Sequence, residues 1–261
     1  MGLLSRQRIA LAAVLACGLA HFTPATALEA ASPDSTRATE LPVSTAEPFG
    51  LPTLPPTAGA LQDKWRALAR KLDDERVQLA LCDGDRERCA SDAALRFLAI
   101  VDLGRSREGR ARLGEINRAI NLAIHPMSDL AQYGEVDVWS PPLATFDRGA
   151  GDCEDYAIAK FVALRQAGVS AEDLRIVIMR NVLHGEDHAV AAARLDGHWL
   201  MLDNQRMAMV EDSYVRNVRP LFVMDEQHLK TYADPELLAA GPDRDAAPAI
   251  AAQPALISAS N

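Results

Sequence analysis

The chain has 261 residues, and its 27 Lys and Arg against 36 Asp and Glu give a net charge of −9 at pH 7. This negative net charge and the lack of a basic tract argue against nucleic-acid binding, because binding to phosphates requires clustered positive charge. After the first 27 residues no stretch is long and apolar enough to span a membrane, so we predict no span in the mature protein.

The N-terminal segment has the features of an export signal. Arg6 and Arg8 precede an apolar run over residues 9–20, and the small residues 25–27 (Ala-Thr-Ala) fit a signal-peptidase site. We therefore predict a signal peptide over 1–27. The sequence Val-Leu-Ala-Cys before Gly18 also weakly resembles a lipoprotein cleavage site, and cleavage there would leave Cys17 as a lipidated first residue.

Composition divides the rest of the chain into three parts. Residues 28–57 and 234–261 are rich in Pro, Ala and small polar residues and have no apolar periodicity, which predicts a disordered linker and a disordered C-terminal tail. Residues 58–233, between them, are enough for one domain with a single core.

Three cysteines remain once Cys17 is removed with the signal peptide. Cys82 and Cys89 lie close together in a polar loop that contains a glycine, and exported proteins meet an oxidising environment, so we predict a disulfide between them. Cys153 is then the unpaired cysteine. A lone thiol in such a compartment is either buried or used.

The first half of the domain has helical periodicity. Residues 61–81 and 110–125 carry apolar side chains at helical spacing, and another helix follows Ser91, its predicted N-cap. Pro126 ends the third of these helices. Residues 129–150 lack any regular pattern, and we predict an irregular connection there.

A buried helix is predicted immediately after that connection. It begins at Asp152, the predicted N-cap, and ends near Gly168. Its side chains are apolar on nearly every face, which is typical of a helix inside a domain.

The second half of the domain has the pattern of strands. Residues 174–179, 188–194 and 198–203 are runs of branched or apolar residues, and Asp196-Gly197 joins the last two as a two-residue hairpin. Further strands are expected at 210–211 and 219–224. Helices followed by antiparallel strands predict an α+β fold.

The unpaired cysteine stands on the first turn of the buried helix. A thiol attacks a carbonyl as its thiolate, and the N-terminus of a helix favours that anion. Cys153 is therefore a candidate nucleophile. The alternative is a packed core cysteine, because buried free cysteines are common.

The hairpin supplies partners for that thiol. With residues 196–197 as the turn, the register places His188 and Asp203 on one face as diagonal neighbours, although a one-residue slip would separate them. Cys153 is then the nucleophile, His188 the base and later the acid, and Asp203 the group that orients the imidazole. Asn204 is the rival for the third role, but the strand period puts it on the opposite face.

Three acidic residues flank the cysteine: Asp152, Glu154 and Asp155. Capping and the helix dipole are sufficient reason for acidic residues there. Their charges would also raise the pKa of the thiol. A calcium ion held by these oxygens would cancel the repulsion, so a calcium site is the second interpretation. A zinc site on Cys153 and His188 lacks the paired spacing typical of structural zinc.

At these positions the sequence resembles a known family. Residues 151–160 (Gly-Asp-Cys-Glu-Asp-Tyr-Ala-Ile-Ala-Lys), 187–190 (Asp-His-Ala-Val) and 202–204 (Leu-Asp-Asn) resemble the bacterial transglutaminase-like cysteine proteinases and, among them, the LapG-type periplasmic proteases. The resemblance covers about residues 61–232, and the block around Cys153 is highly specific.

The resemblance implies a papain-like, transglutaminase-type fold with a Cys-His-Asp triad on Cys153, His188 and Asp203. It implies a calcium requirement, with Asp152 and Glu154 as ligands and Asp155 as a further one. It also implies a periplasmic protein that cleaves the N-terminal region of a large surface adhesin and so disperses biofilm. The periplasmic domain of an inner-membrane cyclic di-GMP receptor is the implied inhibitor.

Two other functions fit the same residues. A transglutaminase or amidase would use the same triad, because these motifs do not distinguish transfer to an amine from transfer to water. A non-catalytic binding module is disfavoured, because all three triad positions are filled. Trp139 resembles a tryptophan that precedes the active site in relatives, but the Ser-Pro-Pro that follows departs from the family pattern, so its role stays open.

Overall fold

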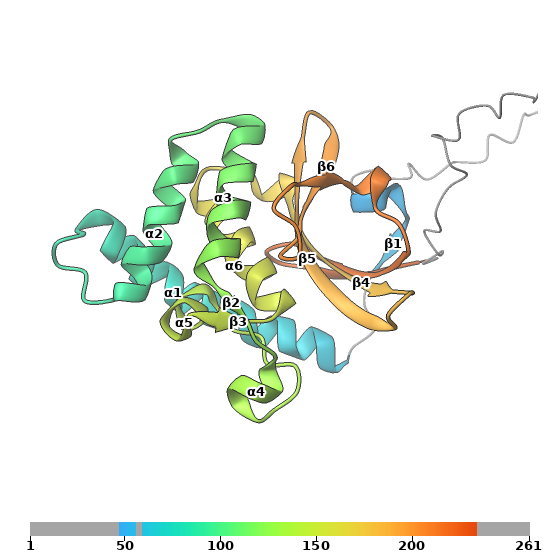
Figure 1. Cartoon of the computed structure of the whole chain (residues 1–261), viewed down its shortest axis with the longest axis horizontal. Coiled ribbons are helices and arrows are strands. Elements are labelled where there is room, and N and C mark those ends of the chain that lie inside the picture. Colours follow the sequence, from blue (N-terminus) through green and yellow to red (C-terminus); the bar gives the residue numbers. More distant parts are fainter. Residues whose placement is uncertain (1–46, 56–58, 234–261) are drawn as a thin grey trace, which may run out of the picture. The chain divides into compact units, whose positions relative to one another are not determined.

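The computed structural model describes residues 47–55 and 59–233 (Figure 1). The predicted signal peptide over 1–27 with its lipidation alternative at Cys17, most of the predicted linker, and the predicted tail over 234–261 lie outside these residues. In the described part of the chain, no helix has both the length and the apolar character needed to cross a membrane.

Helices form the first half of the domain and strands the second, so the predicted α+β class is confirmed. The α-helices are α1 (Ala60–Gly84), α2 (Asp92–Arg105), α3 (Gly109–Ala123), α4 (Asp129–Tyr133), α5 (Pro142–Arg148) and α6 (Cys153–Gln166). The short 3-10 helices are η1 (Pro48–Gly50), η2 (Ala171–Asp173) and η3 (Asp212–Tyr214).

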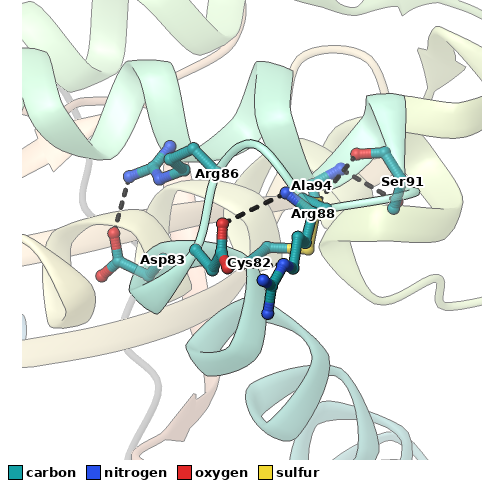
Figure 2. The surroundings of a disulfide bond; sticks show 8 residues. Cys82, Asp83, Arg86, Arg88, Ser91 and Ala94 are labelled. Atoms are coloured by element: carbon teal, nitrogen blue, oxygen red, sulfur yellow. Dashed lines mark hydrogen bonds and ion pairs between the residues drawn. A yellow bond between two sulfur atoms is a disulfide. The ribbon is translucent and has the colours of Figure 1, made fainter.

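The turn between α1 and α2 is closed by a disulfide. Cys82 and Cys89 are joined with an S–S distance of 2.10 Å (Figure 2). Ser91 is the N-cap of α2, and its Oγ accepts the backbone N–H of Ala94 at 3.2 Å. The loop therefore holds α1 against α2 through a covalent bond and a capped helix start.

The connection over residues 129–150 is more regular than predicted. It contains α4, α5 and the strand β3, each too short to give a periodic signal. Gly134 and Gly149, with φ of 70° and 72°, end the two helices in the left-handed conformation that glycine adopts most readily. The preceding helix α3 ends at Ala123 rather than at residue 125, because the chain then turns into β2.

The strands form two sheets. They are β1 (Thr53–Leu54), β2 (His125–Pro126), β3 (Ala150–Gly151), β4 (Leu174–Asn181), β5 (Glu186–Leu195), β6 (His198–Leu202), β7 (Val210–Glu211), β8 (Val218–Met224) and β9 (Leu229–Tyr232). The main sheet has the order β1-β9-β8-β4-β5-β6-β7, and β2 pairs in parallel with β3. In the β5–β6 hairpin Leu195 pairs with His198 and Ala191 with Leu202, which is the predicted register.

The helices pack on one face of the main sheet, with α6 against β4 and β5 (Figure 1). Successive residues of the strands point to opposite faces of the sheet. Ile176 and Ala191 join the core that includes the helices, whereas Val177 and Val190 join a second core on the other face. This alternation follows from the two-residue period of a strand and places the start of α6 beside β5.

Residues 47–55, assigned to the disordered linker from composition, belong to the folded domain. Thr53 pairs with Tyr232 of β9, and Glu47 is buried in ion pairs with Arg175 at 2.6 Å and with Lys230 at 2.7 Å. The linker prediction is therefore wrong for this part. The partners lie far along the chain, so local composition could not indicate them.

The side chain of Glu75, in α1, caps the N-terminus of α5. Its carboxylate accepts the backbone N–H groups of Leu143 at 2.9 Å and of Ala144 at 3.3 Å. Burial raises the pKa of Glu75 to about 7, although these two donors oppose the shift. The folded state therefore holds a proton that the unfolded state has already lost between its ordinary pKa of 4.5 and about 7.

This raised pKa predicts a loss of stability with rising pH. The contribution of Glu75 is complete below the unfolded pKa and is lost as pH rises through the folded value, so Tm should fall between about pH 5 and pH 8. Glu75→Gln should flatten that slope, and Glu87→Gln, an exposed match, should not. Thermal melts across this pH range test the prediction, and equal slopes in the three proteins would contradict it.

Candidate active site

The thiol of Cys153 lies at the junction of α6 and β5. Cys153 is the first residue of α6 and is half-buried. Its Sγ accepts the backbone N–H of Ala189 at 3.4 Å, and its S–H points to Glu154 Oε2 at 3.1 Å. Asp152 occupies the N-cap position, but its side chain makes no capping hydrogen bond, contrary to the predicted capping role. The side chain is thus available for another role.

His188 and Asp203 are in direct contact. His188 Nε2 lies 2.9 Å from Asp203 Oδ1, as the hairpin register predicts for diagonal neighbours. Asp203 follows β6 directly, and its Oδ1 also accepts the N–H of Gln205 at 3.0 Å. The imidazole therefore turns Nε2 toward the carboxylate, and Nδ1 is the ring nitrogen left for another partner.

The pKa shifts of Asp203 and of the Cys153 thiol have opposite directions. Burial raises the pKa of Asp203, but the hydrogen bond and charge of His188 outweigh it and keep that pKa below its ordinary value. Cys153 shows the opposite effect. Burial, and next the charge of Glu154, raise the pKa of its thiol far above the ordinary value. Without a compensating charge, this thiol is a poor nucleophile.

An acidic cluster adjoins the thiol. One carboxylate oxygen from each of Asp129, Asp152 and Glu154 lies within 4.8 Å of the others. Oδ1 of Asp129 and Oδ1 of Asp152 are buried without a hydrogen-bond partner. Burial and the charge of Glu154 raise the pKa of Asp152 to about 9. Buried oxygens that lack donors and repel one another suit a hard cation such as calcium.

The cluster differs by one residue from the predicted calcium ligands. Asp155 is not one of these three: it is fully buried, and its Oδ1 accepts the backbone N–H of Ser140 at 2.9 Å, while its Oδ2 is buried without a hydrogen-bond partner. A Cβ at Gly151 would come within 2.7 Å of the Asp155 side chain, so the glycine leaves room for it. Asp129, which sequence reasoning missed, is the third member of the cluster. Asp129 begins α4, and it is too far from Asp152 and Glu154 in the sequence for a local pattern to predict that they lie close together.

Two clefts meet at Cys153 and His188. The first, of about 370 Å³, is lined mainly by apolar side chains: Leu61, Trp139, Ile178, Ala189 and Phe222. The second, of about 790 Å³, is lined mainly by polar ones, including Asn204, Gln205 and Arg206. Trp139 packs edge-on against Trp65 with ring centres 6.4 Å apart. Its role, open from sequence, is to form a wall of the apolar cleft.

Comparison with known proteins gives one family match. The family model described as "Bacterial transglutaminase-like cysteine proteinase BTLCP" matches residues 78–217, more than half of the chain. The matched segment contains the thiol of Cys153, the imidazole of His188, the carboxylate of Asp203 and the acidic cluster. A search of curated proteins gave no significant match.

Solved structures give a second comparison. EGTA-treated Legionella pneumophila LapG is 21% identical, with 63% of this chain and 88% of that chain covered and a TM-score of 0.50. The calcium-bound form of the same protein is also 21% identical, with 69% of this chain and 93% of that chain covered and a TM-score of 0.49. The likeness to the EGTA-treated structure concerns the fold, and with the family match it confirms the predicted transglutaminase-like fold.

Proposed function

The chain belongs to the bacterial transglutaminase-like cysteine proteinases, and on that premise we propose that it is a calcium-dependent periplasmic endoprotease that cleaves the N-terminal region of a large surface adhesin. One observation carries the proposal: a thiol and an imidazole from separate segments line the meeting point of two clefts, and a carboxylate from a third segment holds the imidazole. His188 Nε2 is bonded to Asp203, and the Cys153 thiol is held at the neighbouring Ala189.

The proposed reaction has two steps, formation of an acyl-enzyme on Cys153 and its hydrolysis by water. The Cys153 thiol gives its proton to His188 Nδ1 and its sulfur bonds to the scissile carbonyl carbon. The imidazolium then protonates the leaving amine as the peptide bond breaks. Water, deprotonated by His188, releases the acyl group. Asp203 keeps the imidazole in orientation throughout. The two clefts would hold the substrate chain on either side of the scissile bond.

Calcium is proposed for the cluster of Asp129, Asp152 and Glu154. Three converging carboxylates, two of them with unpartnered buried oxygens, are the donor set that calcium prefers. When bound, the ion would offset the negative charge that raises the pKa of Cys153. Asp155 is proposed to support the site by holding Ser140.

The compartment and the partners of the protein are also proposals. The sequence features of a signal peptide and the Cys82–Cys89 disulfide both favour an oxidising compartment, which for a bacterial proteinase of this family is the periplasm. The family resemblance supports the two partners: a repetitive adhesin as substrate and the periplasmic domain of an inner-membrane cyclic di-GMP receptor as inhibitor.

The test is a cleavage assay with purified mature protein. The substrate is the N-terminal region of the large repetitive adhesin of the same organism, and the products are separated on gels and weighed by mass spectrometry. We expect one cut with calcium and none with EGTA. Cys153→Ala should leave the substrate intact. Cleavage that survives this substitution would overturn the proposed nucleophile, and a product mass increased by an added amine would indicate transfer rather than hydrolysis.

A further inference from the structure

A lysine lies buried behind the site. Lys160 belongs to α6, two turns beyond Cys153, and is completely inaccessible to solvent. Its Nζ donates to the backbone carbonyl of Leu202 at 3.0 Å and stands 5.7 Å from the centre of the Tyr156 ring. Leu202 is the last residue of β6, and Asp203 follows it. Lys160 lines neither cleft, so it does not contact the substrate.

Packing alone does not account for this residue. Moving an ammonium group out of water is costly, and an apolar side chain of similar volume often serves stability as well or better. Burial lowers the pKa of Lys160 to about 7, although the charge of Asp203 opposes the shift. A methionine would fill the same space without that cost. The lysine therefore needs a reason beyond filling the core.

We propose that Lys160 is a positioning residue, which fixes the end of β6 through Leu202 and adds its positive charge to the effect of His188 in keeping the adjoining Asp203 carboxylate ionised. The inference rests on the proposed roles of His188 and Asp203. Three elements face Asp203. His188 contacts its carboxylate from β5, Lys160 adds positive charge from α6, and Asn121 of α3 binds its backbone carbonyl at 3.0 Å.

The test compares wild type with Lys160→Met. We expect kcat to fall by about tenfold or more because a slightly misplaced imidazole transfers protons poorly. KM should stay within about twofold, since substrate contacts are unchanged. The acid limb of the pH–rate profile should move to higher pH, because Asp203 without the nearby cation keeps its proton longer. Tm should be equal or higher. Lys71→Met, at an exposed position of α1, is the matched control.

Unchanged kcat would overturn the proposal, as would a loss of kcat with a lower Tm and an unmoved acid limb. If Lys160→Met does not fold, Lys160→Gln replaces it, since glutamine keeps a hydrogen-bond donor without the charge. That variant must still displace the acid limb for the proposal to stand. The outcomes that would overturn the proposed function are distinct from those that would overturn the role of Lys160. In that case wild type would not cleave the adhesin region, or Cys153→Ala would cleave it as well as wild type does.

Discussion

Replacing Cys153 or His188 by alanine is expected to lower kcat by about 10⁴-fold or more, and the double variant should lose little beyond either single one. The reason is that the two groups act as a unit. A thiol without its base stays protonated, and burial together with Glu154 already raises the pKa of Cys153. Single-turnover cleavage of the adhesin region measures the effect. His198→Ala, at an exposed histidine of the same hairpin, is the matched control.

The third position of the triad has its own control. Asp203→Ala should cost less than His188→Ala, because an imidazole without its carboxylate partner still accepts a proton. Asn204→Ala should have a small effect, since only Asp203 contacts the imidazole among these two neighbours. Losses that rank Asn204 above Asp203 would contradict the assignment. A His188→Ala variant with more than about a tenth of wild-type kcat would contradict the triad itself.

The triad could be predicted because local rules fix its geometry. Asp196-Gly197 allows one tight turn, with φ of 51° and 84°, and a tight turn sets the register of both strands. The strand period then places His188 and Asp203 on one face. Cys153 follows from the helix start after Gly151. These relations involve residues close together in the sequence, where periodicity and turn chemistry are informative.

Other features depend on contacts that no local pattern encodes. Asp129 reaches the acidic cluster from α4, a helix of five residues that sits in a segment without periodicity. The pairing of Thr53 with Tyr232 joins the two ends of the domain. Lys160 sits in a helix that reads as apolar, and only the arrangement of α6 behind β6 gives its ammonium a partner. Composition therefore placed the N-terminal boundary of the domain too late, and reasoning from the residues beside Cys153 did not bring Asp129 into the acidic cluster.

Two sets of calcium ligands differ in one residue: the set predicted from sequence includes Asp155, and the cluster in the structure includes Asp129. Asp129→Asn distinguishes them, because it should weaken calcium binding by about tenfold or more, or about 1.4 kcal/mol, only if Asp129 is a ligand. Asp152→Asn should do the same, because both carboxylates have buried oxygens without a hydrogen-bond partner. Asp147→Asn, an exposed carboxylate of α5, should leave the affinity unchanged. Calorimetric titration in a Cys153→Ala background gives the affinities without self-cleavage or turnover.

Calcium should also stabilise the fold, and this readout is independent of activity. A ligand at 100 times its Kd adds about 2.7 kcal/mol to the free energy of unfolding, which for a domain of this size raises Tm by roughly 5–10 °C. The rise should disappear with EGTA and in Asp129→Asn. Since Asp155 already binds Ser140, Asp155→Asn should lower Tm with and without calcium but preserve the calcium-dependent rise. A preserved rise in Asp129→Asn, lost instead in Asp155→Asn, would restore the ligand set predicted from sequence.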